Sequence, residues 1–453
     1  MEELARFQAY LRINTAQPTP NYSEAVIFFK GLGQSLFPGI PIVEQHGDEP
    51  RPFATVPIEL RILELIPQKP IGLLAMIQCY PDLPSVYLNS HIDVVPAPAE
   101  EWSSPPFEAA ILPSGRIVAR GTQDMKSVGM QYLEAMAKIR REAIPLGRTV
   151  HVTFVPDEEI GGVYGTQPFV KSRTFAAMHI GFGLDEGLAT EGPHFDVFTG
   201  ERVAWWLRFE IKGNSGHGSK LLDDTPSEKM AHLLHSLYTF RDAERAKMRA
   251  GTPLGQVTSL NVDWYRGGVT TDGGRTFHVN CVPGKIEFGV DFRIPPSIDP
   301  ESFKARLMGW MQQAEDAAAA PTPAPALETP AAPTQTTAET PFLQTRTIRV
   351  WPLQLNPPIN TPLVPVNSPW WDAFMGTAKD MGLDFQPAVF PAATDARHIR
   401  EHGIPCFGFS PMNLTPSLLH QPDEYLHKDI YLAGVEIYRH LIPRLANAAV
   451  PGR

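Results

Sequence analysis

A histidine and an aspartate two positions apart, His91 and Asp93, follow an apolar run that begins at Val86. We predict a strand over Val86 to Val95, in which alternation points both side chains to the same side. The carboxylate can then hold the imidazole in one tautomer while the other ring nitrogen binds a metal ion. Taken alone, the pair is more typical of a hydrogen-bonded histidine near the end of a strand.

Three acidic segments and a late histidine supply further candidate ligands. They are Asp124, Asp157 to Glu159, the pair Asp185 and Glu186, and His420. Adjacent glutamates at a strand end can divide their roles, one binding a metal ion and the next acting as a general base toward water. A helix cap is the simpler alternative for Asp124. An exposed charged turn is the alternative for 157–159, but it does not explain the glycine pair at 161–162.

The elements around these residues predict an α/β domain. Apolar alternation at 150–154 and 180–184 predicts two more strands that end in acids, and helical spacing at 128–136 predicts a helix. The carboxyl ends of such strands meet where an open α/β sheet places its active site. Two imidazoles and three carboxylates can hold two divalent ions about 3.5 to 4 Å apart when one carboxylate bridges. Ligation by nitrogen and oxygen favours zinc, with cobalt or manganese as substitutes.

The middle of the chain predicts a second, inserted domain. Its elements are a strictly alternating strand at 203–211, a helix from about Ser227, strands at 257–265 and 285–293, a helix from Pro300 and a strand at 346–351. This βαββαβ order is ferredoxin-like. We therefore predict a catalytic domain at 1–198 and 353–453, and a lid or dimerisation domain at 199–352. An Ala/Pro-rich segment, 317–341, is predicted to be an extended, mobile loop.

The composition of the chain restricts which partners and which cellular compartment are expected. The chain has 453 residues, a formal charge of −10 and no long run of either sign, which disfavours nucleic acid and anionic membranes. Three scattered cysteines, Cys79, Cys281 and Cys406, exclude a disulfide framework and favour a reducing cytoplasm. We find no signal-peptide pattern in 1–13 and no apolar run of roughly 20 residues that would span a membrane.

Six segments carry a resemblance to a known family: Asn89 to Val95, Ala119 to Lys126, Thr153 to Glu159, Pro369 to Trp371, Pro391 to Asp395 and Gly408 to Asn413. With them, nearly the whole chain resembles the co-catalytic zinc family of aminoacylases and carboxypeptidases. This family includes carboxypeptidase G, succinyl-diaminopimelate desuccinylase and acetylornithine deacetylase. The sequence is most similar to the aminoacylase-1 branch.

The resemblance implies a role for each candidate ligand. Asp124 would bridge two zinc ions, with His91 and Glu186 completing one site and Glu159 and His420 the other. Asp185 is the alternative to Glu186. Asp93 would orient His91, and Glu158 would be the general base.

The resemblance also implies substrate contacts. His217 matches a lid histidine that reaches the neighbouring subunit's active site in a homodimer, although a plain loop histidine between glycines is the alternative. Asn280, Arg293 and Thr394 match positions that contact substrate. Arg293 is suited to a two-pronged contact with a carboxylate, or to an ion pair on the sheet surface. The loop at 270–275 is predicted to be a hairpin extension, and 270–277 is predicted to be an insertion just before Asn280.

The expected activity is hydrolysis of N-acyl-L-amino acids to a carboxylate and a free amino acid. A dipeptidase or carboxypeptidase of the same family is the alternative. A binding protein that keeps the fold without catalysis is disfavoured, because Glu158 and every expected ligand are present.

Overall fold

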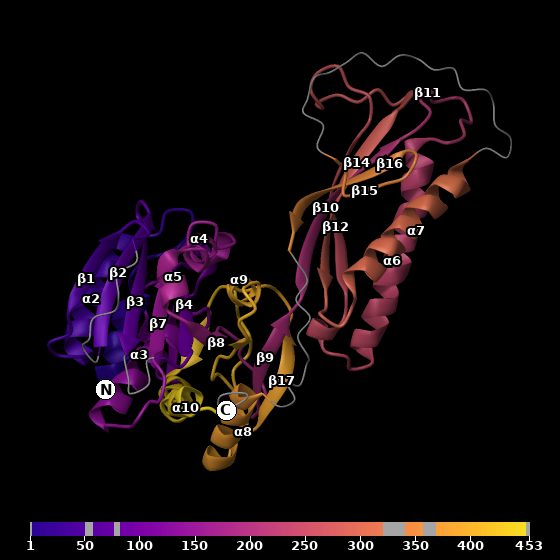
Figure 1. Ribbon diagram of the computed structural model, residues 1–453. Helices are drawn as coiled ribbons and strands as arrows, with labels where there is room; N and C mark the ends of the chain where they lie inside the picture. The colour runs from indigo at the N-terminus through magenta and orange to yellow at the C-terminus, as the bar shows by residue number, and fades with distance from the viewer. Residues whose placement is uncertain (1, 50–57, 77–81, 320–339, 357–367, 450–453) are drawn as a thin grey trace. The chain divides into compact units, whose positions relative to one another are not determined.

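The computed structural model describes residues 2–49, 58–76, 82–319, 340–356 and 368–449 (Figure 1). The chain divides into two compact units. Unit 1 is formed by Met1–Gly200, Thr361–Phe390 and Thr394–Arg453, and unit 2 by Glu201–Asn360 and Pro391–Ala393. None of the helices in the described ranges combines the length and the apolar character needed to span a membrane.

A mixed sheet forms the centre of unit 1. In the described residues its spatial order is β1 (Ile42–His46), β2 (Ile58–Ile66), β3 (Lys69–Met76), β7 (Val150–Val155), β4 (Ser85–His91), β8 (Ile180–Asp185), β18 (Cys406–Gly408), β9 (Phe195–Glu201) and β17 (Phe385–Phe390). Strand β4 runs parallel to both β7 and β8. Because parallel strands end at the same edge, the segments that follow β4, β7 and β8 emerge together.

Helices cover both faces of this sheet (Figure 1). The helices of unit 1 are α1 (Glu2–Leu11), α2 (Tyr22–Leu36), α3 (Lys126–Arg141), α4 (Thr166–Val170), α5 (Arg173–Ala177), α8 (Pro369–Met381), α9 (Ala396–Arg400) and α10 (Lys428–Ala446). Along β4, Val86 and Leu88 pack into the core beneath α2, α3 and α10. Tyr87 packs into the opposite core, beneath α4, α5 and α9. This alternation is the period-2 pattern of a strand buried on both faces.

A small sheet in unit 1 joins two distant segments. It consists of β5 (Ala110–Ile111), β6 (Arg116–Val118) and β19 (Tyr425–His427), with β6 in the middle. The pairing Tyr425↔Val118 brings the chain just after His420 beside the chain just before Asp124. The small sheet therefore brings the loop that carries Asp124 close to the loop that carries His420.

In its described residues, unit 2 consists of two antiparallel sheets and two α-helices. Its elements are β10 (Val203–Lys212), β11 (Gly216–His217), α6 (Pro226–Arg249), β12 (Ser259–Gly267), β13 (Cys281–Val282), β14 (Lys285–Ile294), α7 (Pro300–Ala318), β15 (Leu343–Gln344) and β16 (Ile348–Leu355). The larger sheet has the order β12-β14-β10-β16-β15, with a core between it and the pair α6 and α7. The ferredoxin-like order predicted from sequence is confirmed.

Three expectations can be compared with the structure in detail. The strand predicted to run from Val86 to Val95 was wrong at its end, because β4 stops at His91 and Asp93 lies beyond it. Of the Ala/Pro-rich segment at 317–341, residues 320–339 lie outside the described residues, and α7 continues through Ala318. The hairpin extension predicted at 270–275 is slightly longer in the structure, where an antiparallel bridge joins Thr270 and Phe277.

Candidate active site

Asp124 lies between two imidazoles. Its Oδ1 atom is 2.8 Å from His91 Nε2, and its Oδ2 atom is 3.3 Å from His420 Nε2. The helix that follows, α3, begins at Lys126 with Met125 in the N-cap position and no side-chain cap bond. The carboxylate of Asp124 is therefore not a helix cap, and its two oxygens face two different histidines.

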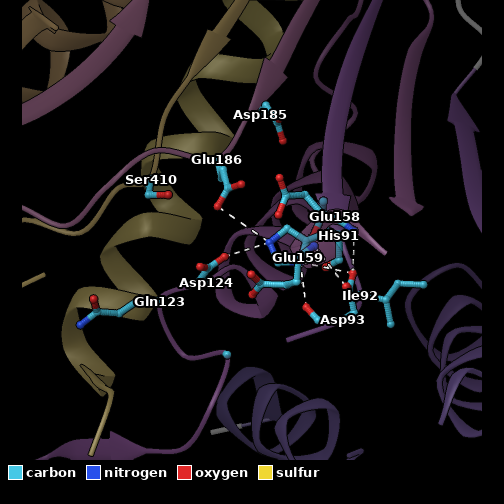
Figure 2. A network of polar contacts seen from close by, with 12 residues as sticks. His91, Ile92, Asp93, Gln123, Asp124, Glu158, Glu159, Asp185, Glu186 and Ser410 are labelled. Atoms are coloured by element: carbon cyan, nitrogen blue, oxygen red, sulfur yellow. Dashed lines mark hydrogen bonds and ion pairs between the residues drawn. The ribbon is translucent and has the colours of Figure 1, made fainter. Parts of the chain in front are cut away.

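Two glutamates complete the arrangement on either side of Asp124 (Figure 2). Glu186 Oε2 is 3.8 Å from His91 Nε2, and Glu159 Oε2 is 3.2 Å from His420 Nε2. The ligand atoms of His91, Asp124 and Glu159 lie within 4.8 Å of one another, and so do those of His91, Glu158 and Glu186. This spacing suits cations that share ligands.

The neighbouring acid, Asp185, has a different partner. Its Oδ1 atom accepts a hydrogen bond from Asn89 Nδ2 at 3.2 Å, and the side chain is buried. Glu186 is the member of the pair that contacts His91. The geometry therefore favours Glu186 over Asp185 as the donor in this cluster.

Burial and close charges shift the pKa values of the cluster. Burial and the nearby Asp124 raise the pKa of Glu159 to about 7 and hold the pKa of Glu186 well above its ordinary value. Burial opposes ionisation of Asp124 as well, but hydrogen bonds from His420 and His91 outweigh it and lower its pKa. Hydrogen bonds to Asp124 and Glu159 raise the pKa of His420 to about 10. The cluster without a metal therefore binds protons that a divalent cation would displace.

The donor set fits a metal cofactor. It combines two imidazoles with several carboxylates and contains no thiol, which is the ligand chemistry of hydrolytic zinc, cobalt or manganese sites. Glu159 Oε1 is buried and, within the described ranges, has no hydrogen-bond partner, so a ligand atom is available there. The two imidazoles differ in access: the His91 side chain is 1% exposed and that of His420 is 56% exposed.

Asp93 contacts His91 through its backbone. The imidazole Nδ1 atom is 2.8 Å from the carbonyl oxygen of Asp93 and 3.8 Å from its carboxylate. The carboxylate instead accepts hydrogen bonds from the backbone amides of Glu158 and Glu159, at 3.0 and 3.2 Å. Asp93 therefore holds both the imidazole and the turn that carries the two glutamates.

That turn is a short 3-10 helix, Glu158–Ile160, bounded by left-handed residues. Asp157 has φ 63° before it, and Gly161 and Gly162 have φ 94° and 69° after it. A Cβ atom on Gly162 would lie 2.8 Å from Asp395 Oδ1, so both the conformation and the space require glycine. The turn leaves the Glu158 carboxylate 3.9 Å from the Arg397 guanidinium.

Glu424 and Gln123 hold the loop before Asp124. Glu424 is fully buried and accepts from the backbone amides of Gly121 and Gln123 at 3.2 and 2.6 Å. It also accepts from the Arg120 guanidinium at 2.8 Å. The side chain of Gln123 donates to Tyr425 O and accepts from Leu418 N. These contacts tie the loop of Asp124 to the loop of His420.

Sequence reasoning assigned no role to Glu424 or Gln123, and it offered Asp157 only as one of three adjacent acids. Gln123 and Asp157 lie within the segments that carry the family resemblance, and this position was the available signal for them. Glu424 and Gln123 bond mostly to backbone atoms, whereas the Asp157 carboxylate bonds to side chains from distant segments. Such contacts leave no residue spacing that could be recognised in one sequence.

Two residues expected to contact substrate lie together in unit 2. His217 pairs with Cys281 across β11 and β13, and Gly218 N donates to Asn280 O at 2.6 Å. The imidazole of His217 is exposed and lies 2.8 Å from Ser219 Oγ. Both His217 and Asn280 are therefore presented on one exposed two-stranded ribbon.

The other two expected substrate contacts have partners within their own unit. Arg293, on β14, forms an ion pair with Asp291 at 2.9 Å and lies over the ring of Trp206. Thr394 is buried in unit 1, where its hydroxyl accepts from Ala396 N at the start of α9. Their proposed contacts with substrate remain predictions.

Comparison with known proteins identifies the family. A family model described as peptidase family M20/M25/M40 matches residues 87–444. The chain belongs to this family. It is 39% identical to mouse aminoacylase-1, with 98% of this chain and 96% of the mouse protein covered. It is 35% identical to aminoacylase-1 of Dictyostelium discoideum, with 98% of each covered. Within the M20 peptidases, these relatives place the chain in the aminoacylase-1 branch.

Solved structures share the fold. An M20 family metallo-carboxypeptidase from Sulfolobus solfataricus matches with a TM-score of 0.62 and 18% identity, covering 98% of this chain and 99% of the other. A dinuclear metal-binding peptidase of the M20 family from Bacillus subtilis matches with a TM-score of 0.63 and 12% identity, covering 99% of each. The α/β fold class expected from the sequence is confirmed.

Proposed function

We propose that this M20 peptidase-family chain is an aminoacylase, which hydrolyses the amide of N-acyl-L-amino acids to a carboxylate and a free amino acid. The observation that carries the proposal is that Asp124 lies between His91 and His420, which Glu186 and Glu159 also contact, in a chain matched over nearly its whole length by aminoacylases. Two zinc ions, with cobalt or manganese as substitutes, are the proposed cofactors.

We assign the ligands from their contacts. Asp124 would contribute to both metal positions, because its two oxygens face different imidazoles. His91 and Glu186 would complete one position, and Glu159 and His420 would complete the other. When bound, the two cations lower the pKa of water and polarise the amide carbonyl.

Glu158 is the proposed general base. Burial and the nearby Asp395 raise its pKa well above the ordinary value, which suits a carboxylate that must hold a proton between two steps. It takes a proton from the attacking water and returns it to the leaving amine. Asp93 holds the backbone of Glu158 through its hydrogen bond to the Glu158 amide.

His217 and Asn280 are proposed to act from unit 2. An imidazole N–H can donate to the oxygen on which charge develops, and His217 is exposed and free to reach a substrate. Asn280, Arg293 and Thr394 are the proposed substrate contacts. We further propose that the enzyme is a cytoplasmic homodimer joined through unit 2, with His217 serving the partner's site.

A substrate panel tests this function. The full chain, loaded with zinc and with its metal content measured, is offered N-acetyl-L-methionine, other N-acetyl-L-amino acids, their D-enantiomers and matched dipeptides. We expect the N-acetyl-L-amino acids to give the highest kcat/KM. Higher kcat/KM for dipeptides would replace the proposal with a dipeptidase, and binding without turnover would indicate a non-catalytic protein.

A further inference from the structure

The segment before α2 runs beside the segment that carries Asp93. Gln17 N donates to Val94 O at 2.9 Å, and Val94 N donates to Thr15 O at 3.1 Å. The hydroxyl of Thr15 donates to Ile92 O at 2.7 Å. These bonds hold the buried side chain of Gln17 next to Asp93.

The amide group of Gln17 links two buried carboxylates. Its Nε2 atom is 2.8 Å from Asp93 Oδ2 and 2.9 Å from Asp157 Oδ1, so each N–H can donate to a different acid. Both acids are fully buried at 0% exposure. Two like charges in such a place repel each other, and a shared donor between them offsets that repulsion.

Asp157 has two further partners, which come from other elements. Its Oδ1 atom accepts from the Tyr22 hydroxyl at 2.7 Å, and its Oδ2 atom lies 2.6 Å from Lys69 Nζ. Lys69 begins β3 and lies over the rings of Tyr22 and Tyr164. The carboxylate of Asp157 is therefore fixed from α2 and β3 as well as from its own turn.

We propose that Gln17, anchored by Asp157, is a positioning residue for the general base. It holds the Asp93 carboxylate in the orientation that accepts the amides of Glu158 and Glu159, and so fixes the catalytic turn. The inference rests on the proposed function, because the base it positions is the one assigned there. In the described residues the hydrogen bonds of Gln17 go to Asp93, Asp157 and Val94, none of which is an expected metal ligand, so its effect passes through Asp93.

The test compares two buried glutamines of unit 1. Gln17→Met keeps the length of the side chain and removes both donors. Gln45→Met makes the same change on β1, where Gln45 donates to Glu49 O and accepts from Arg61. Lys69→Met removes the ammonium group that lies beside Asp157, at a side chain that is 24% exposed. This variant takes the place of Gln17→Met in the test if Gln17→Met does not fold.

Two measurements are made on each variant. Amide hydrogen exchange is followed in the peptide spanning 155–162 of the metal-free protein, and kcat and KM are measured on the zinc-loaded enzyme at known metal content. We expect faster exchange in Gln17→Met and a kcat about 10- to 100-fold lower with KM within about twofold, the usual size of an outer-shell effect. Lys69→Met should show the same pattern with a smaller change, and Gln45→Met neither change.

Unchanged exchange in Gln17→Met would overturn the proposal, as would an equal loss of kcat in Gln45→Met. Where Gln17→Met does not fold, unchanged exchange in Lys69→Met would overturn it. The exchange measurement uses no substrate. If the wild-type enzyme cleaves no N-acyl amino acid, the proposed function fails on its own, and exchange in 155–162 still decides whether Gln17 holds the turn.

Discussion

In unit 1 the side chain of His91 is 1% exposed and bonds to Asp124 and to the backbone of Asp93. In unit 2 all four histidines, at 217, 232, 235 and 278, are exposed, and the ring of His217 is hydrogen-bonded to Ser219. Metal affinity is higher when the ligands are already held in place, and contacts with neighbouring side chains provide that order for buried His91 and for the more exposed His420. A residue that acts only on bound substrate can stay on the surface.

The largest effect is expected at Glu158, which lies in the ordered site but is not a proposed ligand. Glu158→Gln should keep both metal ions and lower kcat by about 10³- to 10⁴-fold, because general-base catalysis is lost. Metal analysis and steady-state kinetics measure the two effects. Glu191→Gln, at an exposed position of the same unit, is the control. A variant that loses metal, or keeps its activity, would contradict the assignment.

The next largest effect is expected in unit 2. His217→Ala should lower kcat by about 10²- to 10³-fold, the usual cost of removing a donor to a developing oxyanion. Because the side chain is exposed, the free energy of unfolding should change by no more than about 0.5 kcal/mol. Ser219→Ala, which removes only the partner of the ring, is the control.

A clear loss of stability in His217→Ala would break the contrast between the units, since it would make His217 a structural residue. Full activity in the variant would remove His217 from the mechanism. If the histidine acts on the partner's site, mixing His217→Ala with Glu158→Gln should restore part of the activity, because a mixed dimer then contains one intact site.

A smaller effect is expected at Glu424, which holds the Asp124 loop through backbone amides. Glu424→Gln replaces one acceptor oxygen with a donor, so an amide N–H would face backbone N–H groups. We expect metal affinity or kcat to fall by about 10- to 100-fold. Isothermal titration with zinc and kinetics measure this. Glu401→Gln is the control on the surface of unit 1.

The part of the site that could be predicted consists of residues that lie at the ends of strands recognisable from local sequence patterns. His91 ends a strand, and Glu159 and Glu186 follow strands, whose apolar alternation is visible in sequence, and α/β topology brings such strand ends together. Asp93 shows where this reasoning failed. The alternation was continued to Val95, whereas β4 ends at His91, so the Asp93 carboxylate is free to turn toward the glutamate amides.

Contacts between distant segments account for the rest. The bond from Gln17 to Asp93 joins residues 76 positions apart, and the bonds from Glu424 to the Asp124 loop join residues about 300 apart. The periodicity of hydrophobic residues and the residue preferences of turns describe only residues that are close together in the sequence. A single buried polar side chain that bonds to backbone amides follows neither pattern, so only the fold could place it.

The last prediction concerns the loss of stability in acid, to which the buried histidines of unit 1 should contribute and the exposed histidines of unit 2 should not. Burial lowers the pKa of His151, on β7, and of His398, on α9, to about 3 in each case. An unfolded histidine titrates near 6.5, so between pH 6.5 and 3 the unfolded chain binds more protons than the folded one. Each of these two histidines should therefore lower the stability of unit 1 on acidification by up to about 1.4 kcal/mol per pH unit, against the opposite contribution of Glu159 and Asp395, whose pKa values burial raises to about 7.

Urea unfolding of the metal-free protein at pH 7.5 and pH 5.0 measures this loss. His151→Phe should remove about 2 kcal/mol of it, since the folded and unfolded states no longer differ in protonation at that site over the 1.5 units below pH 6.5. His232→Phe, on an exposed face of α6, should leave the loss unchanged. An equal effect of the two substitutions would mean that burial of histidine in unit 1 does not set its response to acid.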